Sequence, residues 1–415
     1  MAGIYIHIPF CRSRCIYCGF YSTTSLKLRQ RYVDALCREM EIRSQKSEVR
    51  SERTDSSAET ISTIYLGGGT PSLLTPDQLR QLFIYINKVY PLASPPIPLA
   101  SPPSPLTSDP EITIEVNPDD VTVEFAAVLQ QLPVNRISMG IQTFDDQRLR
   151  FLRRRHTARQ AIEAVDRLRT ANIRNLSIDL MYGFPGETLA DWEADINAVL
   201  ALNVEHISAY CLTIEEGTPL HRMLKQHNGA CPQCVDEETE RQMYYTLIDR
   251  LEAAGYEHYE ISNFARITPP TGGAGGGHSP FRSRHNSSYW NGTPYIGLGA
   301  AAHSYDIRSR SWNVADIRQY IEGMERGERI FEEELLDDDT RYNDIVTVAL
   351  RTKEGIQLNA LSDKYRNYCI KNARRYLDDG LLELSTAEGA ESPTLHLTRR
   401  GLFVSNMVMS DLMMV

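Results

Sequence analysis

Three cysteines in the first twenty residues are the side chains of this chain best suited to carry chemistry. Cys11, Cys15 and Cys18 have the spacing C-x3-C-x2-C and come directly after the β-type run Ile4–Ile8 and Pro9, so we expect them on a loop. Such a loop can present three thiolates to one iron–sulfur cube, which needs four ligands. The sequence therefore predicts a [4Fe-4S] cluster with one iron left open for a small molecule.

The same cysteines admit other interpretations on their spacing alone, namely a zinc site, a disulfide or chance. Structural zinc needs a second ligand pair at a compatible distance, and disulfide frameworks suit small secreted chains rather than one of 415 residues. Cys37 falls on the apolar face of a helical pattern, so we expect it in the core. Cys231 and Cys234 make only half a metal site and are expected on an exposed loop.

A glycine-rich segment follows the next expected strand. Residues 61–66 form a β-type run, Gly67-Gly68-Gly69-Thr70-Pro71 comes directly after it, and Thr75-Pro76-Asp77-Gln78 then has the form of a helix N-cap. Consecutive glycines let a backbone approach a ligand closely, because no Cβ stands in the way. This strand, loop and helix are therefore either a ligand site or a simple tight turn.

Three polar residues, Glu115, Gln142 and Asp179, lie near the ends of later expected strands. Each could singly be a strand-end cap or part of a loop ion pair. Strand patterns alternate with helical patterns, about six such units precede residue 215, and this indicates a parallel sheet short of a full eightfold barrel. Because parallel strands end at one edge, where such folds bind ligands, we expect these residues to share a site. The predicted fold class is α/β, with a partial (β/α)6 TIM-like barrel.

The cysteine spacing, with Tyr17 just before the last cysteine, resembles the signature of radical S-adenosylmethionine (SAM) proteins. In that family SAM chelates the open iron, and one electron from the cluster cleaves its sulfonium. Carboxylates suit the ribose hydroxyls or the ammonium of SAM, and an arginine suits its carboxylate. The choice among three consecutive arginines rests on the family spacing. The resemblance implies a radical SAM barrel and a SAM-binding set made of Tyr5, Tyr17, Gly68, Gly69, Thr70, Glu115, Gln142, Arg154 and Asp179.

A second motif is His285-Asn286-Ser287-Ser288-Tyr289-Trp290. With the phrase from Tyr5 to Cys18, it resembles the branch that contains the oxygen-independent coproporphyrinogen dehydrogenases and the heme chaperones. In the chaperones HNxxYW is associated with heme, which implies that His285 is an iron ligand of heme. Without the resemblance, His285 would be expected to hydrogen-bond a loop against which Tyr289 and Trp290 pack.

Two features distinguish the members of this branch. The dehydrogenase pattern continues to a fourth cysteine where this chain has Phe20, and the dehydrogenases carry an N-terminal extension, whereas four residues precede Tyr5 here. We therefore expect a heme chaperone that hands heme to an acceptor hemoprotein, a respiratory protein being one candidate. The alternative is the dehydrogenase, which uses SAM to decarboxylate propionate side chains. A structural protein with a vestigial cluster fits less well, because every SAM position is intact.

Charge and hydropathy narrow the class of partner. The net charge of −10 and the pI near 5.6 argue against nucleic acid or an anionic membrane as the main partner. No apolar run approaches the roughly 20 residues of a membrane span, and the chain opens on a strand without a targeting segment. We therefore expect a cytoplasmic protein, in a reducing compartment that suits an oxygen-sensitive cluster.

The expected domain organisation has three parts. Residues 1–306 form the radical SAM core, with flexible insertions near 44–60, 91–110 and 267–284, which are respectively polar, proline-rich and glycine-rich. Residues 307–340, which carry acidic runs, are expected to be a linker. Residues 341–415 show helical patterns at 341–350, 357–365 and 367–379, then two short strands and a last helix, which resembles a winged helix.

Overall fold

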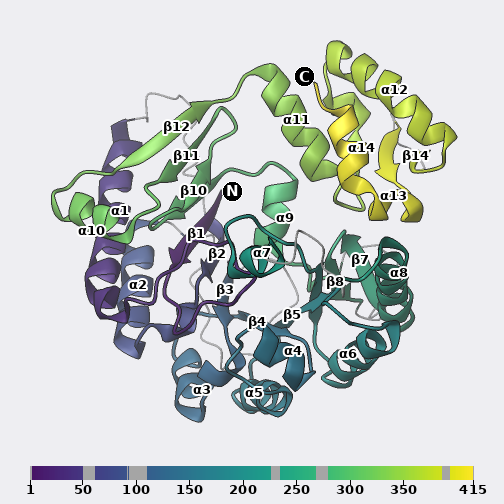
Figure 1. Ribbon diagram of the computed structural model, residues 1–415. Helices are drawn as coiled ribbons and strands as arrows, with labels where there is room; N and C mark the ends of the chain where they lie inside the picture. Colours follow the sequence, from purple (N-terminus) through teal and green to yellow (C-terminus); the bar gives the residue numbers. More distant parts are fainter. Residues whose placement is uncertain are drawn as a thin grey trace, which may run out of the picture.

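The computed structural model describes residues 2–49, 61–90, 92, 110–225, 234–267, 279–385 and 393–414. Within these residues, six parallel strands follow one another in chain order at the centre of a twelve-stranded sheet. They are β1 (Ala2–Ile8), β2 (Ile61–Gly68), β3 (Glu111–Val116), β4 (Arg136–Gln142), β5 (Leu176–Tyr182) and β6 (His206–Cys211). Connecting helices surround the curved sheet (Figure 1): α1 (Arg29–Val49), α2 (Pro76–Val89), α3 (Val123–Leu129), α4 (Asp146–Phe151), α5 (Ala158–Thr170) and α6 (Leu189–Ala201). The predicted α/β partial barrel is confirmed.

Alternation along the strands gives the sheet one apolar face and one polar face. In β1, Ile4, Ile6 and Ile8 are fully buried in the core between sheet and helices, whereas Tyr5 and His7 face the inside of the barrel and hydrogen-bond each other. The barrel interior is therefore polar. Its side chains include Thr63, Tyr65, Thr113, Glu115, Arg136, Ser138, Ser177, Asp179, His206 and Ser208.

Helix starts follow the local sequence closely. Thr75 accepts a hydrogen bond from the backbone of Gln78 at the start of α2, and the Gln78 side chain accepts one from the backbone of Thr75. Thr157 and Gln160 form the same reciprocal box at the start of α5. The predicted cap at Thr75 is confirmed, and the two boxes fix where α2 and α5 begin.

Further strands extend the sheet on both sides. Next to β1 lie β9 (Tyr295–Leu298), β10 (His303–Tyr305), β11 (Ser309–Asn313) and β12 (Phe331–Leu335), and next to β6 lie β8 (Asn263–Arg266) and β7 (Tyr256–Glu260). Helices α7 (Pro219–Lys225) and α8 (Glu237–Ala253) precede β7. Helix α9 (Arg284–Trp290) contacts β2 and β3 where these strands begin, through Thr63 and Glu111, and thereby covers the N-terminal end of the barrel.

Residues 307–340 differ from the predicted linker. They form β11, helix α10 (Ile317–Glu325) and β12, and α10 packs against α1. There the fully buried Glu39 accepts hydrogen bonds from Tyr320 Oη at 2.7 Å and Asn313 Nδ2 at 2.8 Å. All five residues of β12 are exposed, because an outermost strand needs no apolar face. Its acidic run therefore suggested a linker rather than a strand.

Two of the predicted insertions are shorter than expected. Helix α1 continues through residues 44–49, where Gln45, Lys46 and Glu48 are good helix formers. Ser279 Oγ donates to the Arg266 carbonyl and Ser283 caps α9, so residues 279–284 belong to ordered structure. Residues 50–60, 93–109 and 268–278 of the predicted insertions, and Cys231, lie outside the described residues.

The C-terminal unit has its own apolar core and a three-stranded antiparallel sheet. Its elements are α11 (Asp338–Ala349), β13 (Ile356–Gln357), α12 (Asp363–Asp378), β14 (Leu382–Ser385), β15 (Thr394–Leu397), α13 (Arg399–Phe403) and α14 (Ser405–Leu412). The predicted helix at 367–379 is confirmed as part of α12, whereas the predicted helix at 357–365 is wrong. Residues 356–357 pair with β15, and one helix, α12, begins only after Ser362. Arg351 pairs with Glu260 at 2.8 Å and joins the unit to the barrel.

Candidate functional site

The cysteine loop lies at the C-terminal end of β1 and is held at three points. Its two arms join where the Cys11 amide donates to the Thr23 carbonyl at 2.9 Å and the Thr23 amide donates to the Pro9 carbonyl at 2.7 Å. Its middle is tied to the end of α4 and the start of α7 through the backbone of Ile16. Backbone hydrogen bonds therefore hold the loop in a defined position at the rim of the barrel.

The three cysteines are half-buried free thiols, so they form no disulfide with one another. Thr70 Oγ1 lies 3.8 Å from Cys11 Sγ, and Arg154 Nη1 lies 3.7 Å from Cys15 Sγ. Burial raises the pKa of the Cys11 and Cys18 thiols, so their thiolate forms call for a bound cation. Among the described residues no three His, Cys, Asp or Glu side chains converge on a single metal ion. A cluster poses a different requirement, because each thiolate binds a different iron.

The glycine loop packs directly against the cysteine loop. Its Gly69 amide donates to the Ile8 carbonyl at 2.9 Å, and a Cβ at Gly69 would lie only 2.7 Å from the backbone carbon of Pro9. Gly68 has φ +106°, a conformation that favours glycine. Only glycine at these two positions lets the second loop approach the first, which places Thr70 beside Cys11.

Two carboxyl groups of the predicted set face the inside of the barrel near this rim. Glu115 Oε1 accepts from Tyr65 Oη at 2.8 Å, and its Oε2 accepts from the Gly68 amide at 3.0 Å. Asp179 accepts from Ser138 Oγ at 3.3 Å. Burial raises the pKa of Glu115 to about 7 and that of Asp179 to about 6. Both carboxyls would be stabilised in their charged form by a ligand that brings hydrogen-bond donors or an ammonium group.

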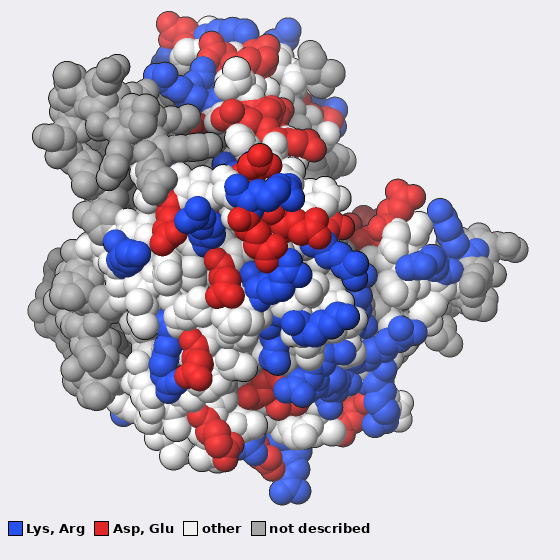
Figure 2. Space-filling view, turned by 90° about the vertical axis from the view of Figure 1, so that its left-hand side faces the viewer, with Lys and Arg blue, Asp and Glu red and all other residues white. Residues whose placement is uncertain are grey.

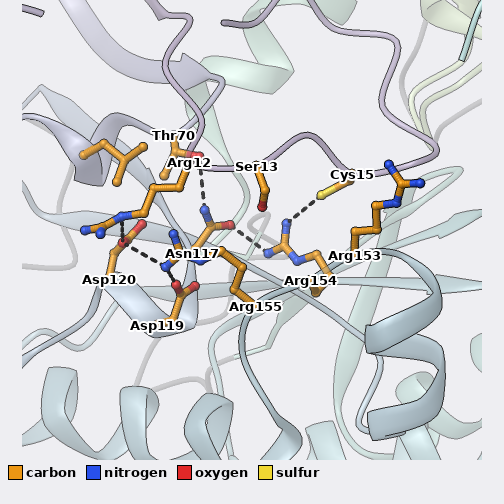
Figure 3. Close-up of a pocket in the computed structure, with 11 residues that line it drawn as sticks. Arg12, Ser13, Cys15, Thr70, Asn117, Asp119, Asp120, Arg153, Arg154 and Arg155 are labelled. Atoms are coloured by element: carbon orange, nitrogen blue, oxygen red, sulfur yellow. Dashed lines mark hydrogen bonds and ion pairs between the residues drawn. The ribbon is translucent and has the colours of Figure 1, made fainter. Parts of the chain in front are cut away.

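A chain of hydrogen bonds connects Arg154 to both loops (Figure 3). Arg154 Nη2 donates to Asn117 Oδ1 at 2.7 Å and to the Gly140 carbonyl, and Asn117 Nδ2 donates to Thr70 Oγ1 at 3.1 Å. Arg153 has φ +60°, and this left-handed residue ends α4 so that the next side chain turns toward Cys15. Asn117 was not among the predicted site residues. Its signal in the sequence is its place directly after a strand, the same signal that Gln142 carries.

The remaining predicted SAM residues lie around the same rim. Gln142 ends β4 with φ 75° and is buried, next to an irregularity in the pairing of β4 with β5. Tyr5 Oη lies 3.0 Å from His7 Nδ1, and its ring stacks on Tyr65. Tyr17 packs on Leu152, Met181 and Phe184. Gln142 thus ends its strand, whereas Tyr5 lies in the middle of β1.

A pocket opens beside the cysteine loop, lined by Arg12, Ser13, Cys15, Thr70, Leu73, Asn117, Asp119, Asp120, Arg153, Arg154 and Arg155 (Figure 3). Asp120, which follows β3, pairs with Arg12 of the cysteine loop at 3.6 Å, and the neighbouring Asp119 pairs with Arg155, which follows α4. These ion pairs join three segments of the chain beside the pocket. Figure 2 shows basic side chains crowded at the lower right of the surface, the side that faces the reader in Figure 1. Four arginines and two aspartates line the pocket, whereas the chain as a whole has a net charge of −10.

His285 lies apart from the cysteine loop, at the opposite end of the barrel. Its side chain is fully buried, Nδ1 is 2.9 Å from Thr63 Oγ1, and Nε2 is 2.9 Å from Tyr289 Oη. The ring also stacks on Tyr65 with centroids 5.1 Å apart. Glu111 accepts hydrogen bonds from the amides of Arg284 and His285 and so holds the start of α9. Both imidazole nitrogens therefore have partners inside the protein.

Comparisons with known proteins agree with this geometry. The model of the radical SAM superfamily matches residues 5–199. Heme chaperone HemW of Bacillus subtilis (strain 168) is 32% identical over 411 residues, which cover 98% of this chain and 98% of the relative. Heme chaperone HemW of Mycobacterium tuberculosis (strain ATCC 25618 / H37Rv) is 31% identical over 418 residues, covering 99% and 94%.

Among solved structures, coproporphyrinogen III oxidase (HemN) from Escherichia coli, a radical SAM enzyme, matches with a TM-score of 0.77. The match covers 99% of this chain and 89% of that chain at 20% identity, so it establishes the fold alone. Within the described parts of this chain, no helix combines the length and apolar character that crossing a membrane requires.

Proposed function

This chain belongs to the HemW family of radical SAM proteins, and from that membership we propose that it binds heme and transfers it to an acceptor hemoprotein. The observation that carries the proposal is similarity over nearly the whole chain to relatives named heme chaperones. A respiratory hemoprotein is our candidate acceptor. We assign the protein to the cytoplasm, because a reducing compartment suits an oxygen-sensitive cluster.

In this function, Cys11, Cys15 and Cys18 would hold a [4Fe-4S] cluster. Three half-buried free thiols on one anchored loop suit this group, and the Arg154 guanidinium beside Cys15 favours a thiolate. When bound, the cluster and SAM together supply one-electron cleavage of the sulfonium. In a chaperone this chemistry would support heme loading or release rather than turnover of a substrate.

The chain's own residues provide fitting contacts for SAM next to that loop. Arg154 Nε is buried without a hydrogen-bond partner, so the guanidinium keeps a donor for the SAM carboxylate. Glu115 and Asp179 would accept hydrogen bonds from the ammonium or the ribose hydroxyls, and Gly69 keeps the approach free of a Cβ. Asn117 would act as a positioning residue, because it holds Arg154 and Thr70 together.

His285 remains our candidate for the heme iron ligand, with one condition. Its Nε2 is hydrogen-bonded to Tyr289 Oη and its ring is fully buried, so iron binding requires Nε2 to lose this partner and α9 to shift. His285→Ala should lower heme retention and leave the iron and sulfide content of the cluster unchanged. Tyr289→Phe removes the competing hydroxyl while keeping the ring, so it should leave heme affinity unchanged or raise it. Normal heme binding by His285→Ala would contradict this assignment.

The function itself is tested with anaerobically reconstituted full-length protein. One sample receives heme, and another receives coproporphyrinogen III with SAM and a reductant. We expect stoichiometric heme binding and no protoporphyrinogen. Transfer is then followed by mixing the heme-loaded protein with an apo-hemoprotein and measuring the acceptor's absorption spectrum. Turnover of coproporphyrinogen III without heme binding would reject the chaperone in favour of the dehydrogenase.

A further inference from the structure

Arg136 is a buried cation inside the barrel that the SAM and cluster assignments do not use. Its side chain is 1% exposed and its Nε has no hydrogen-bond partner. Among the described residues its guanidinium makes no ion pair and no hydrogen bond. Arginine stays protonated in proteins. An unpaired charge at such a position is costly, by several kcal/mol on general grounds, unless a partner of opposite charge is supplied.

Three carboxyl groups of the barrel interior, those of Glu111, Glu115 and Asp179, already accept hydrogen bonds from other groups. Glu111, where β3 begins, accepts from two amides of α9. Glu115 accepts from Tyr65 and Gly68, and Asp179 accepts from Ser138. The other groups that face the guanidinium are uncharged phenols and imidazoles, namely Tyr65, Tyr259, His206 and His285. Asp179 is the one of these carboxyls on which Arg136 has an electrostatic effect, and it makes no hydrogen bond to Arg136 among the described residues, so the buried Nε is left without an acceptor.

A second buried polar atom lacks a partner next to it. Thr113 is directly opposite Arg136 in the pairing of β3 with β4, and its side chain is fully buried with Oγ1 unpaired. Buried polar atoms are almost always hydrogen-bonded, so two unpaired donors side by side indicate a missing acceptor. Guanidinium and hydroxyl together form a donor set that fits the two oxygens of a carboxylate.

We propose that Arg136 and Thr113 bind a carboxylate that enters the barrel from its open, C-terminal end. At that end Tyr5, Glu115 and Asp179 are only partly buried, whereas His206 and His285 below them are fully buried. This inference builds on the proposed function, because heme carries two propionate carboxylates. A small free carboxylate has the same chemistry and is the other possible source.

The test compares hemin with hemin dimethyl ester, whose propionates cannot carry charge, on the anaerobically prepared full-length protein. Wild type should bind hemin about tenfold more tightly than the ester, which corresponds to one charge-assisted contact. This preference should disappear in Arg136→Met and shrink in Thr113→Val, which keeps the side-chain shape. Arg150→Met, which removes an exposed arginine of α4, should retain the full preference.

A second experiment uses free propionate as the ligand and does not depend on heme binding. If the source is a free carboxylate, millimolar propionate should raise the melting temperature of wild type and of Arg150→Met, but not of Arg136→Met or Thr113→Val. Should Arg136→Met fail to fold, Arg136→Lys and Thr113→Val serve in its place. Lysine keeps the positive charge but lacks the planar guanidinium that donates two parallel hydrogen bonds. An equal affinity for hemin and its ester, together with no effect of propionate, would overturn the inference. Failure of hemin to bind at all would reject the proposed function and leave the propionate arm to decide this one.

Discussion

The two ends of the barrel are built on opposite principles. At the C-terminal end, Arg154 Nε is unpaired and Gln142 and Arg153 hold left-handed backbone conformations. At the N-terminal end, His285 has partners on both ring nitrogens and Glu111 pairs with two amides of α9. Unpaired atoms and strained residues are retained where a ligand can compensate them. The comparison teaches that the first end is made to receive a ligand, whereas α9 at the second end is held so that it keeps the fold closed.

The largest expected effect of a single change is at the open end. Cys15→Ala should abolish cluster assembly, because one of only three available thiolates is lost. The measurement is iron and acid-labile sulfide after anaerobic reconstitution, with the visible absorption spectrum. Cys37→Ala is the matched control, since this cysteine is buried in α1 and should not affect iron content. Unchanged iron in Cys15→Ala would refute the cluster assignment.

At the closed end the expected effect is on folding and not on the cluster. Glu111→Gln replaces a carboxylate that accepts two amide hydrogen bonds by a group with one acceptor oxygen and a competing donor. We expect a loss of about 2 kcal/mol in the free energy of unfolding. Urea unfolding measures it, and iron content should match wild type. A variant that unfolds like wild type would show that the start of α9 does not depend on this carboxylate.

The closed end should also weaken with acid through Glu257. Burial opposes its charge, but hydrogen bonds from Arg282, Ser279 and Lys353 prevail and lower its pKa to about 2. Because the folded pKa lies below the ordinary value of 4.5, this contribution is complete above pH 4.5 and is lost as the pH falls toward 2.

Glu257→Gln should therefore be less stable than wild type at pH 7, by about 1 kcal/mol, and the difference should shrink below pH 4.5. Urea midpoints at pH 7, 4.5 and 3 measure this trend. A difference that stays constant over this pH range would mean that the charge of Glu257 does not contribute to the stability of the fold.

The smallest expected effect concerns strain at the open end. Arg153 is exposed and left-handed at φ +60°, so Arg153→Gly should raise the free energy of unfolding by about 0.5 kcal/mol. Arg153→Ala keeps the strained backbone without the charge and should show no such gain. Thermal unfolding of both variants measures this effect. Equal stability of the two variants would show that backbone strain at Arg153 does not distinguish the two ends of the barrel.

The sequence predicts the barrel well because its signals are local. Each of the six parallel strands has an apolar run, and caps such as Thr75 with Gln78 mark where helices begin. Polar residues at strand ends, such as Glu115, could be assigned to one rim from topology alone. Other parts depend on contacts that no local pattern carries. Asn117 matters only because Thr70 and Arg154 come together around it.

Sequence patterns did not predict the segments that are largely exposed or whose packing partners are distant in the sequence. The segment of α10 and β12 was expected to be a linker, because the partners of a solvated outer strand and a docked helix lie far away in the chain. Likewise, no spacing indicates that His285 lies under the barrel with both nitrogens engaged, or that Arg136 Nε lacks a hydrogen-bond partner. These facts follow from the interior that several strands enclose together.

Strand β12 also bears on how copies of this protein behave toward one another. It is the outermost strand of the sheet in the described chain, and its outer row of backbone groups is a template that another strand could extend. Glu332, Glu333 and Glu334 are consecutive there, and all are exposed. Two copies that met edge to edge would bring these glutamates face to face, and their repulsion opposes fibre growth. The acidic run thus protects a concentrated solution of the protein from aggregation along this edge.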